Sequence, residues 1–310
     1  MTIPADVQPD TTPLDPPVAS TAPLSTVRPF YWSVRRELWE HRSIYFGPLA
    51  AAGVVLFGFL LGMMIVTHVG RSSWAFDPAR QGHALVIPYD IAAFAILATS
   101  LIVALVYCLG ALHNERRDRS ILFWKSLPVS DLTAVLSKAA IPLVVLPVVT
   151  FAIIVGTQLV MLLLNSTALL LHGVGAGPLW GQVFQSPLDM PYALVALALW
   201  HAPIYGWLLL VSAWAKRAPF LWAVLPPLGL CLLEKIAFDT GHLASIVGRR
   251  LMGGLGEAFK AAPGSQDVIG ASPQMDPIGF LTNPGLWVGL VVTAVFLAAA
   301  VWVRRYREPI

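Results

Sequence analysis

Long runs of apolar residues dominate this chain. Six stretches of about twenty or more residues contain almost no charge, and they are residues 44–67, 88–112, 139–164, 191–215, 219–238 and 285–303. A helix needs about 20 apolar residues to cross the hydrocarbon core of a bilayer. The pattern therefore predicts an all-α polytopic membrane protein with six transmembrane helices. Pro142 and Pro147 in the third stretch, and Pro226 and Pro227 in the fifth, predict kinked helices there.

Two segments outside these stretches are amphipathic. In residues 28–42, Val34 and Leu38 recur at helical spacing beside a basic face, which predicts a helix lying in the membrane surface before the first span. The alternative is a snorkelling start to that span. Residues 242–260 repeat the amphipathic pattern, and Gly253, Gly254 and Gly256 would allow a hairpin. We expect an outer helix there that is interfacial or re-entrant.

The composition agrees with a membrane protein. Apolar residues make up 57% of the 310 residues and charged residues 12%, whereas a soluble chain carries about 25% charged residues. The longest connection, from Phe238 to Pro284, leaves no room for a hidden catalytic domain. Residues 1–27 contain six prolines and no Lys or Arg, which predicts a disordered tail. Residues 28–310 then form a single transmembrane domain.

The basic residues predict the orientation of the spans. With the N-terminus in the cytoplasm, 14 of the 20 Lys and Arg residues fall in cytoplasmic segments, as the positive-inside rule requires. Both termini are then cytoplasmic. The alternative makes the uncharged segment 165–188 a seventh span, but its glycines and Pro178 favour an outer loop or a re-entrant turn.

Few residues of this chain point to catalysis. No His-Glu-x-x-His spacing is present, and none of the five lysines follows a glycine as in a phosphate-binding loop. The chain is therefore expected to bind no metal or cofactor and not to be an enzyme by itself. Ionisable residues within spans are functional by default, so His201 and Glu234 are candidates for a substrate path or outer gate, and Leu251 and Phe259 of the outer amphipathic segment join them. The plainer interpretations are a hydrogen-bonded packing residue for His201 and emergence at the outer interface for Glu234.

The connection between the second and third spans carries the strongest local signal. Residues 113–130 are dense in charge, with Phe123 and Trp124 in the middle and Pro128 near the end. Ser120 can cap a short helix that reaches Leu127. A short helix with exposed aromatic side chains is typical of a docking element, whereas the plainer interpretation is a charged loop with an interfacial tryptophan.

This connection resembles that of the permease subunits of ABC-2 type ABC transporters. The family pattern is approximately Glu-Arg-x-x-Gly-Thr-Leu, a short hydrophobic run, Ser-Leu-Pro-Val-Ser, and a lysine about ten residues later. The matching residues here are Glu115, Arg116, Ser120, Ile121, Ser126, Leu127, Pro128, Val129, Ser130 and Lys138. The chain departs from the pattern at Arg119, where Gly is frequent, and at Leu122, where an acidic residue is common.

The resemblance implies a permease subunit of an ATP-driven exporter in the bacterial inner membrane, which moves a hydrophobic or amphiphilic substrate outward. Two cytoplasmic ABC ATPase subunits would carry the ATP and Mg, and a second permease subunit, identical or different, would complete the complex. Membrane lipids are expected partners and nucleic acid is not. The residues expected to couple to the ATPase are Glu115, Arg116, Ser120, Phe123, Trp124, Leu127 and Pro128.

Two other functions stay open at this point. One is an intramembrane enzyme that acts on lipids. Its catalytic groups would have to be His201, or His113 together with Asp90. The other is a membrane protein that anchors or gives immunity without transport. Association with an ATPase distinguishes the permease from both.

Overall fold

The structure is a computed structural model that describes residues 27–69, 78–118, 130–171, 189–260 and 274–306, together with 177, 180 and 181. The described chain is almost entirely helical, apart from an antiparallel pair of two-residue strands, β1 (Phe259–Lys260) and β2 (Gln274–Met275). Within these described ranges, six helical runs are long and apolar enough to cross a membrane. This confirms the prediction of a multi-pass, helical membrane protein.

Each spanning-length run coincides with one of the predicted stretches. They are α2 (Ser43–Val69), α3 (Pro78–Gly110), the continuous run of α6 (Asp131–Ala140), η1 (Ile141–Val145) and α7 (Leu146–Leu171), then α9 (Asp189–Trp214), α10 (Pro219–Phe238) and α14 (Pro284–Tyr306). The shorter helices are α1 (Val27–Glu40), α4 (His113–Arg117), α11 (His242–Met252), α12 (Gly254–Ala258) and α13 (Pro277–Thr282).

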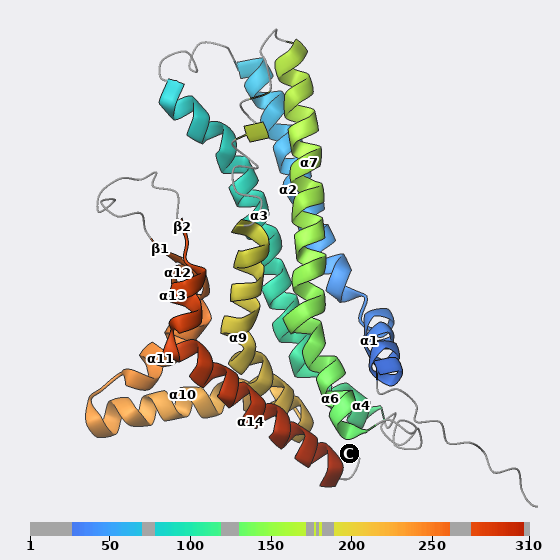
Figure 1. The fold of residues 1–310 in the computed structure, drawn as a ribbon, viewed down its shortest axis with the longest axis vertical. Coiled ribbons are helices and arrows are strands. Elements are labelled where there is room, and N and C mark those ends of the chain that lie inside the picture. Colours follow the sequence, from blue (N-terminus) through green and yellow to red (C-terminus); the bar gives the residue numbers. More distant parts are fainter. Residues whose placement is uncertain are drawn as a thin grey trace, which may run out of the picture.

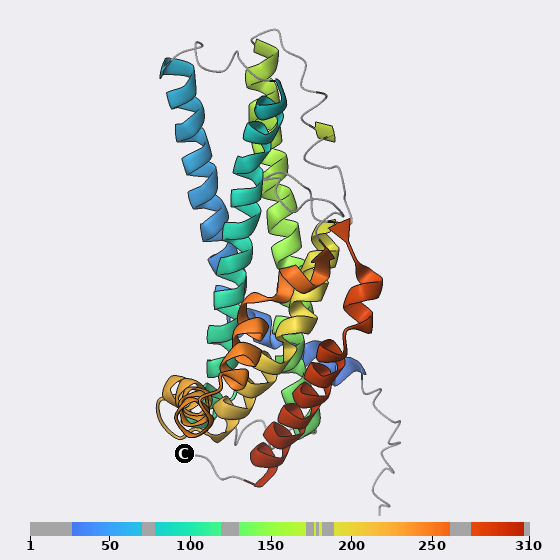
Figure 2. The same cartoon turned by 90° about the vertical axis from the view of Figure 1, so that its left-hand side faces the viewer.

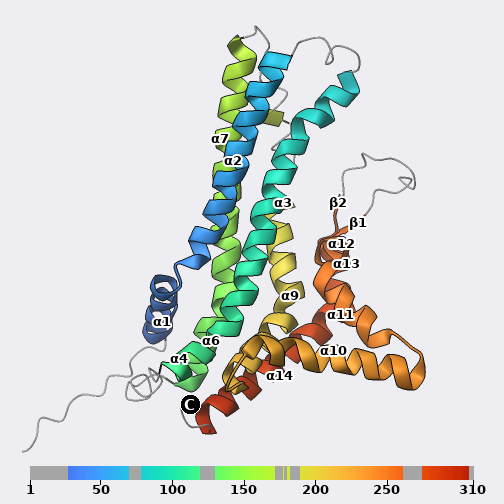
Figure 3. The ribbon, with the colours of Figure 1, turned by 180° about the vertical axis from the view of Figure 1, so that it is seen from behind.

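The long helices form two groups (Figures 1 and 2). Helices α2, α3 and α7 stand side by side along the long axis, and α9 packs against both α14 and the lower part of α3. Helix α9 is the most enclosed, since 61% of its apolar segment is buried, against 6% for α10. Helices α1, α4 and α6 and the C-terminal end of α14 gather at one end of the molecule (Figure 3).

Helix α10 leaves this bundle and runs crosswise to α2, α3 and α7 (Figures 1 and 3). The residues that flank it, Ala218 and Asp239, have left-handed backbone angles with φ of 48° and 50°. These turns direct α10 away from α9 and then return the chain through α11. The Trp207 indole holds the start of α10 by donating a hydrogen bond to the Ala223 carbonyl at 3.0 Å.

The proline pairs act differently in the two runs. The π-helical turn η1 includes Pro142 and ends two residues before Pro147, because proline supplies no backbone N–H and a π-bulge absorbs the interrupted ladder. Helix α10 stays helical through Pro226 and Pro227. Helix α7 reaches Leu171, so the first part of the segment 165–188, expected to be an outer loop, belongs to this helix.

Candidate functional site: a buried ionic cluster

A cluster of charged side chains joins four helices at the end of the molecule where α1, α4 and α6 meet. We call Arg36, Glu37, Glu115, Asp131, Lys138 and Arg304 the ionic cluster. Lys138 Nζ lies 2.7 Å from Glu37 Oε1 and 3.0 Å from Glu115 Oε1. Arg304 Nη1 lies 2.6 Å from Glu115 Oε2, and Arg304 Nε lies 3.1 Å from Asp131 Oδ1. Arg36 Nη2 completes the set at 2.9 Å from Glu115 Oε1.

Most of these charges are removed from solvent. Glu37 and Lys138 are each 1% exposed, and Glu115 and Arg304 are also buried. A buried charge is tolerated only when it is paired and its remaining hydrogen-bonding capacity is satisfied. The Tyr107 hydroxyl meets this need for Glu37 by donating to its Oε2 at 2.9 Å. The cluster is thus a compensated network that depends on all of its members.

Local structure explains how α6 contributes two members. Ser130 caps the helix, because its Oγ accepts the Thr133 N–H at 3.1 Å. Asp131 then lies in the first turn, where the helix dipole favours a negative charge. Lys138 follows two turns later on the same helix and reaches Glu37 on α1 and Glu115 on α4. The amphipathic start of the third run therefore places both side chains in the cluster.

A second set of contacts fastens α4 to the C-terminal end of α9. The Ser212 hydroxyl oxygen accepts hydrogen bonds from the backbone N–H groups of Leu112, at 3.0 Å, and His113, at 2.9 Å. Arg116 donates to the Ala213 carbonyl, and His113 Nδ1 lies 3.1 Å from the Ala215 carbonyl oxygen. Basic side chains at a helix C-terminus satisfy its free carbonyls. The start of the predicted coupling connection is therefore fixed to the most buried helix.

A cleft lies beside the ionic cluster. Its volume is about 730 Å³, and it opens between α1, α6 and α14. Its polar lining comprises Ser33, Arg36, Glu37, Glu115, Ser130, Asp131, Ser137, Lys138, Arg304 and Arg305. The cluster therefore forms one wall of a space large enough to receive a side chain or a short segment of a partner.

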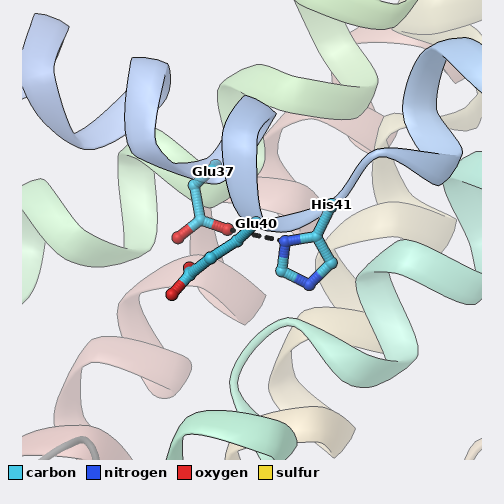
Figure 4. Close-up of side chains that lie close together, drawn as sticks. All are labelled: Glu37, Glu40 and His41. Atoms are coloured by element: carbon cyan, nitrogen blue, oxygen red, sulfur yellow. Dashed lines mark ion pairs between the residues drawn. The ribbon is translucent and has the colours of Figure 1, made fainter.

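Three residues near this cleft have the geometry of a metal site. The ligand atoms of Glu37, Glu40 and His41 lie within 4.8 Å of one another (Figure 4). Glu37 Oε1 is already paired with Lys138, however, and Glu40 Oε2 lies 3.3 Å from Arg36 Nε. A metal ion would have to displace these cations. The arrangement is better explained as ion pairing within the protein.

The candidates for an outer gate divide into two places. His201 is buried in α9, with its ring nitrogens 2.9 Å from the Leu197 carbonyl oxygen and 3.3 Å from that of Leu251. Phe259 packs edge-on against Tyr192 of the same helix. Glu234 lies apart from them, near the C-terminal end of α10, where its carboxylate accepts the backbone N–H groups of His242 and Leu243 at the start of α11.

Arg250 holds the segment after α10 onto α9 and α14. Its Cζ lies 4.2 Å above the Trp200 ring, and its guanidinium donates to the carbonyl oxygens of Trp200 and Gly285. Burial lowers the pKa of this guanidinium from its ordinary value, while Glu257 acts in the opposite direction. The Asn283 side-chain amide donates a hydrogen bond of 2.8 Å to the Glu257 carboxylate. We call these contacts the Arg250 clamp.

The predicted coupling residues fall partly outside the described residues. Glu115 and Arg116 are described and belong to the two sets of contacts above, whereas Ser120, Phe123, Trp124, Leu127 and Pro128 lie outside the described ranges. Sequence reasoning did not single out Glu37, Ser212, Arg250 or Arg304. One signal was available for Glu37, since an acidic residue lies between Val34 and Leu38 on the side of α1 that faces the core.

The pair proposed for a lipid enzyme is widely separated. His113 begins α4, whereas Asp90 lies 20 residues before the end of α3 at Gly110, and a helix of that length spans about 30 Å. His113 is also engaged with the Ala215 carbonyl.

Comparison with known proteins gave no relative: no family model, no curated protein and no solved structure matches this chain.

Proposed function

We propose that this chain is the permease subunit of an ATP-driven ABC exporter, which moves a hydrophobic or amphiphilic substrate outward across the bacterial inner membrane. The observation that carries the proposal is the position of Glu115. This residue opens the connection that resembles the ATPase-coupling segment of ABC-2 permeases, and it is ion-paired with Lys138 on α6, Arg304 on α14 and Arg36 on α1.

Such pairing would pass movement from the connection into the bundle. A displacement of Glu115 acts on three helices through charge-assisted hydrogen bonds, which are the strong class of protein hydrogen bond. The neighbouring Arg116 acts on α9 through the Ala213 carbonyl. A partner that moves the connection on binding and hydrolysing ATP would therefore move α1, α6, α9 and α14 together.

The surroundings of α10 support a complex larger than one chain. Helix α10 has one buried residue, Ala223, and exposes large apolar side chains along its length. A helix that is apolar on all sides is stable only within lipid or protein. A second permease subunit, identical or different, and membrane lipids are the partners we assign to it. Two ABC ATPase subunits complete the complex on the cytoplasmic side, where we place α1, α4, α6 and both termini.

The test is affinity purification of this chain from its native membranes in mild detergent, followed by measurement of ATP hydrolysis and of substrate export from vesicles. The wild-type chain should co-purify with an ATPase in stoichiometric amount. The variant Phe123→Ala/Trp124→Ala should lose the ATPase and export, because the two aromatic side chains are proposed to enter a pocket on the partner.

A matched control makes the same two types of substitution at exposed positions elsewhere in the chain. Phe94→Ala/Trp302→Ala also removes one phenylalanine and one tryptophan, which are 66% and 64% exposed on α3 and α14. The control should retain the ATPase. A wild-type chain that purifies without any ATPase overturns the proposal and favours an anchoring or immunity protein, and lipid turnover by the purified chain alone would favour the enzyme.

A further inference from the structure

Helix α1 turns two different sides to its surroundings. Val34 and Leu38 pack against the main apolar core, and Glu37 is buried in the ionic cluster. The exposed surface of α1 presents Tyr31, Trp32, Arg35 and Trp39, with Trp32 also at the edge of the cleft, and Arg42 follows in the turn that joins α1 to α2. We call these five residues the outward stripe. Tyr31, Trp32 and Trp39 are 58%, 59% and 70% exposed, so the stripe is uncovered.

The stripe combines indole rings with cations. The Arg35 guanidinium carbon lies 5.1 Å from the ring centres of both Trp32 and Trp39, so the two indoles hold the charge between them. Among the described residues, no carboxylate lies within ion-pair distance of Arg35 or Arg42. The nearby Glu40 is paired with Arg36. The stripe therefore has two exposed positive charges and no negative charge of its own.

The position of the outward stripe beside the start of α2 favours a lipid surface as its partner. Only the turn at His41 and Arg42 separates α1 from α2, and the apolar run of α2 begins at Ile44. If α2 crosses the bilayer, the stripe is held where the hydrocarbon ends. Tryptophan and tyrosine prefer this level, and arginine matches phosphate oxygens with two parallel hydrogen bonds.

We propose that the outward stripe binds anionic phospholipid in the leaflet at which α2 begins. Arg35 and Arg42 contact the phosphate groups, while Trp32 and Trp39 lie among the headgroups. The net negative charge of the lipid is required, because the stripe offers two cations and no anion to pair with a zwitterionic headgroup. The proposal requires only membrane insertion and is independent of the proposed transport function.

The test uses the purified full-length chain in detergent, titrated with short-chain phosphatidylglycerol, with phosphatidylcholine of the same chain length and with inorganic phosphate. Bound lipid is counted by native mass spectrometry, and stabilisation is followed by thermal unfolding. The wild-type chain should bind phosphatidylglycerol in preference to phosphatidylcholine. The variant Arg35→Gln/Arg42→Gln should bind phosphatidylglycerol roughly 30-fold more weakly at low salt, since each basic residue contributes about 1 kcal/mol toward an anionic surface.

The control variant Lys216→Gln/Arg217→Gln removes the same charge from an exposed turn outside the stripe. It should change the affinity far less. Equal losses in both variants, or unchanged affinity in the stripe variant, would overturn the proposal. So would equal stabilisation by inorganic phosphate, because that result would assign the site to a free anion rather than to a lipid. Both variants replace exposed side chains, so lipid-free unfolding temperatures should match that of the wild-type chain.

Discussion

Lys138 and Lys235 show how strongly the surroundings of an ion pair determine its contribution. In both pairs the lysine nitrogen lies 2.7 Å from a carboxylate oxygen. The side chains of Lys138 and Glu37 are 2% and 1% exposed, whereas those of Lys235 and Asp239 are 63% and 90% exposed. In water the attraction between the charges is screened and their hydration is retained, but inside the protein each charge depends on its partner.

Replacing Lys138 by methionine should therefore lower the free energy of unfolding by about 3–5 kcal/mol, because Glu37 and Glu115 lose a cation inside the protein. The matched change Lys235→Met should cost less than about 1 kcal/mol. Unfolding by increasing dodecyl sulfate in mixed micelles measures both values. In the double variant Glu37→Gln/Lys138→Met the losses should be far from additive. Additive losses, or a small loss for Lys138→Met, would show that the two groups do not depend on each other.

A second prediction for a single residue concerns Ser212. Its hydroxyl oxygen accepts two buried backbone N–H groups, and an unsatisfied buried donor costs about 1–3 kcal/mol. Ser212→Ala should destabilise the chain by about that amount and speed hydrogen exchange at Leu112 and His113. Ser245→Ala, which removes an exposed hydroxyl in α11, serves as the control. Unchanged exchange at Leu112 and His113 would contradict the role of this hydroxyl.

The sequence indicated only some of these residues, and the reason is physical. Glu115 and Lys138 were identified because they belong to a local motif. Their partners lie far away along the chain: 101 residues separate Glu37 from Lys138, and 189 separate Glu115 from Arg304. Such contacts depend on how the helices pack. Charged residues near the ends of spans are common, and nothing local marks Arg304 as buried.

The Arg250 clamp can be tested through a glycine on the neighbouring helix. A Cβ atom at Gly289 would lie 2.8 Å from Arg250 Cζ, so Gly289→Ala should displace the guanidinium from the carbonyls of Trp200 and Gly285. We expect a loss of about 1.5–3 kcal/mol in the local stability of α11, since this is the usual range for hydrogen bonds to charged groups. Hydrogen exchange of α11 amides measures it.

The control for this change is Gly229→Ala in α10, where a Cβ atom meets nothing within 4 Å. It should leave α11 unaffected. Adding Gly289→Ala to Arg250→Ala should bring little further loss, because the alanine acts through Arg250. A full additional loss would mean that Gly289 is required for another reason.

The turn before α10 yields a prediction about a whole element. Ala218 has a left-handed backbone at φ 48°, which costs a residue with a Cβ atom about 1–2 kcal/mol and costs glycine little. Ala218→Gly should therefore stabilise the chain by up to about 1 kcal/mol once the greater freedom of the unfolded glycine is subtracted. Ala223→Gly inside α10 should destabilise it by about 1 kcal/mol. Unfolding in mixed micelles compares the two variants. If Ala218→Gly is destabilised, the left-handed backbone conformation at this turn is contradicted.

At the scale of elements, the apolar pattern predicted the number and approximate positions of the long helices but not all of their ends. Helix α3 begins at Pro78, ten residues before the predicted start at Pro88. Proline suits the first turn of a helix, where no N–H is needed, and Pro88 is accommodated inside. The pattern also could not predict that α10 leaves the bundle, because its direction is set by the backbone at Ala218 rather than by its composition.

The whole molecule is organised around α9, which touches α3, α10, α12 and α14. All six spans are apolar on most sides, so the sequence does not reveal which one is surrounded by protein and which ones by lipid. Small residues allow close approach of helices in membranes, but glycines occur in all six of the spans here. Only the packing distinguishes a glycine at an interface from one that faces outward.

Gly206 and Gly58 test this distinction. A Cβ atom at Gly206 would already lie 3.4 Å from Thr293 Cα and from Phe296 Cβ on α14, whereas one at Gly58 on α2 meets nothing within 4 Å. Gly206→Leu should force α9 and α14 apart and cost about 1–3 kcal/mol, the usual range for overpacking, while Gly58→Leu should be neutral or stabilising. Unfolding in mixed micelles measures both. Because Arg304 lies on α14, separation of the helices should also disturb the ionic cluster, so Gly206→Leu and Lys138→Met should combine less than additively. Full additivity would mean that the packing of α9 against α14 and the cluster hold the molecule together independently.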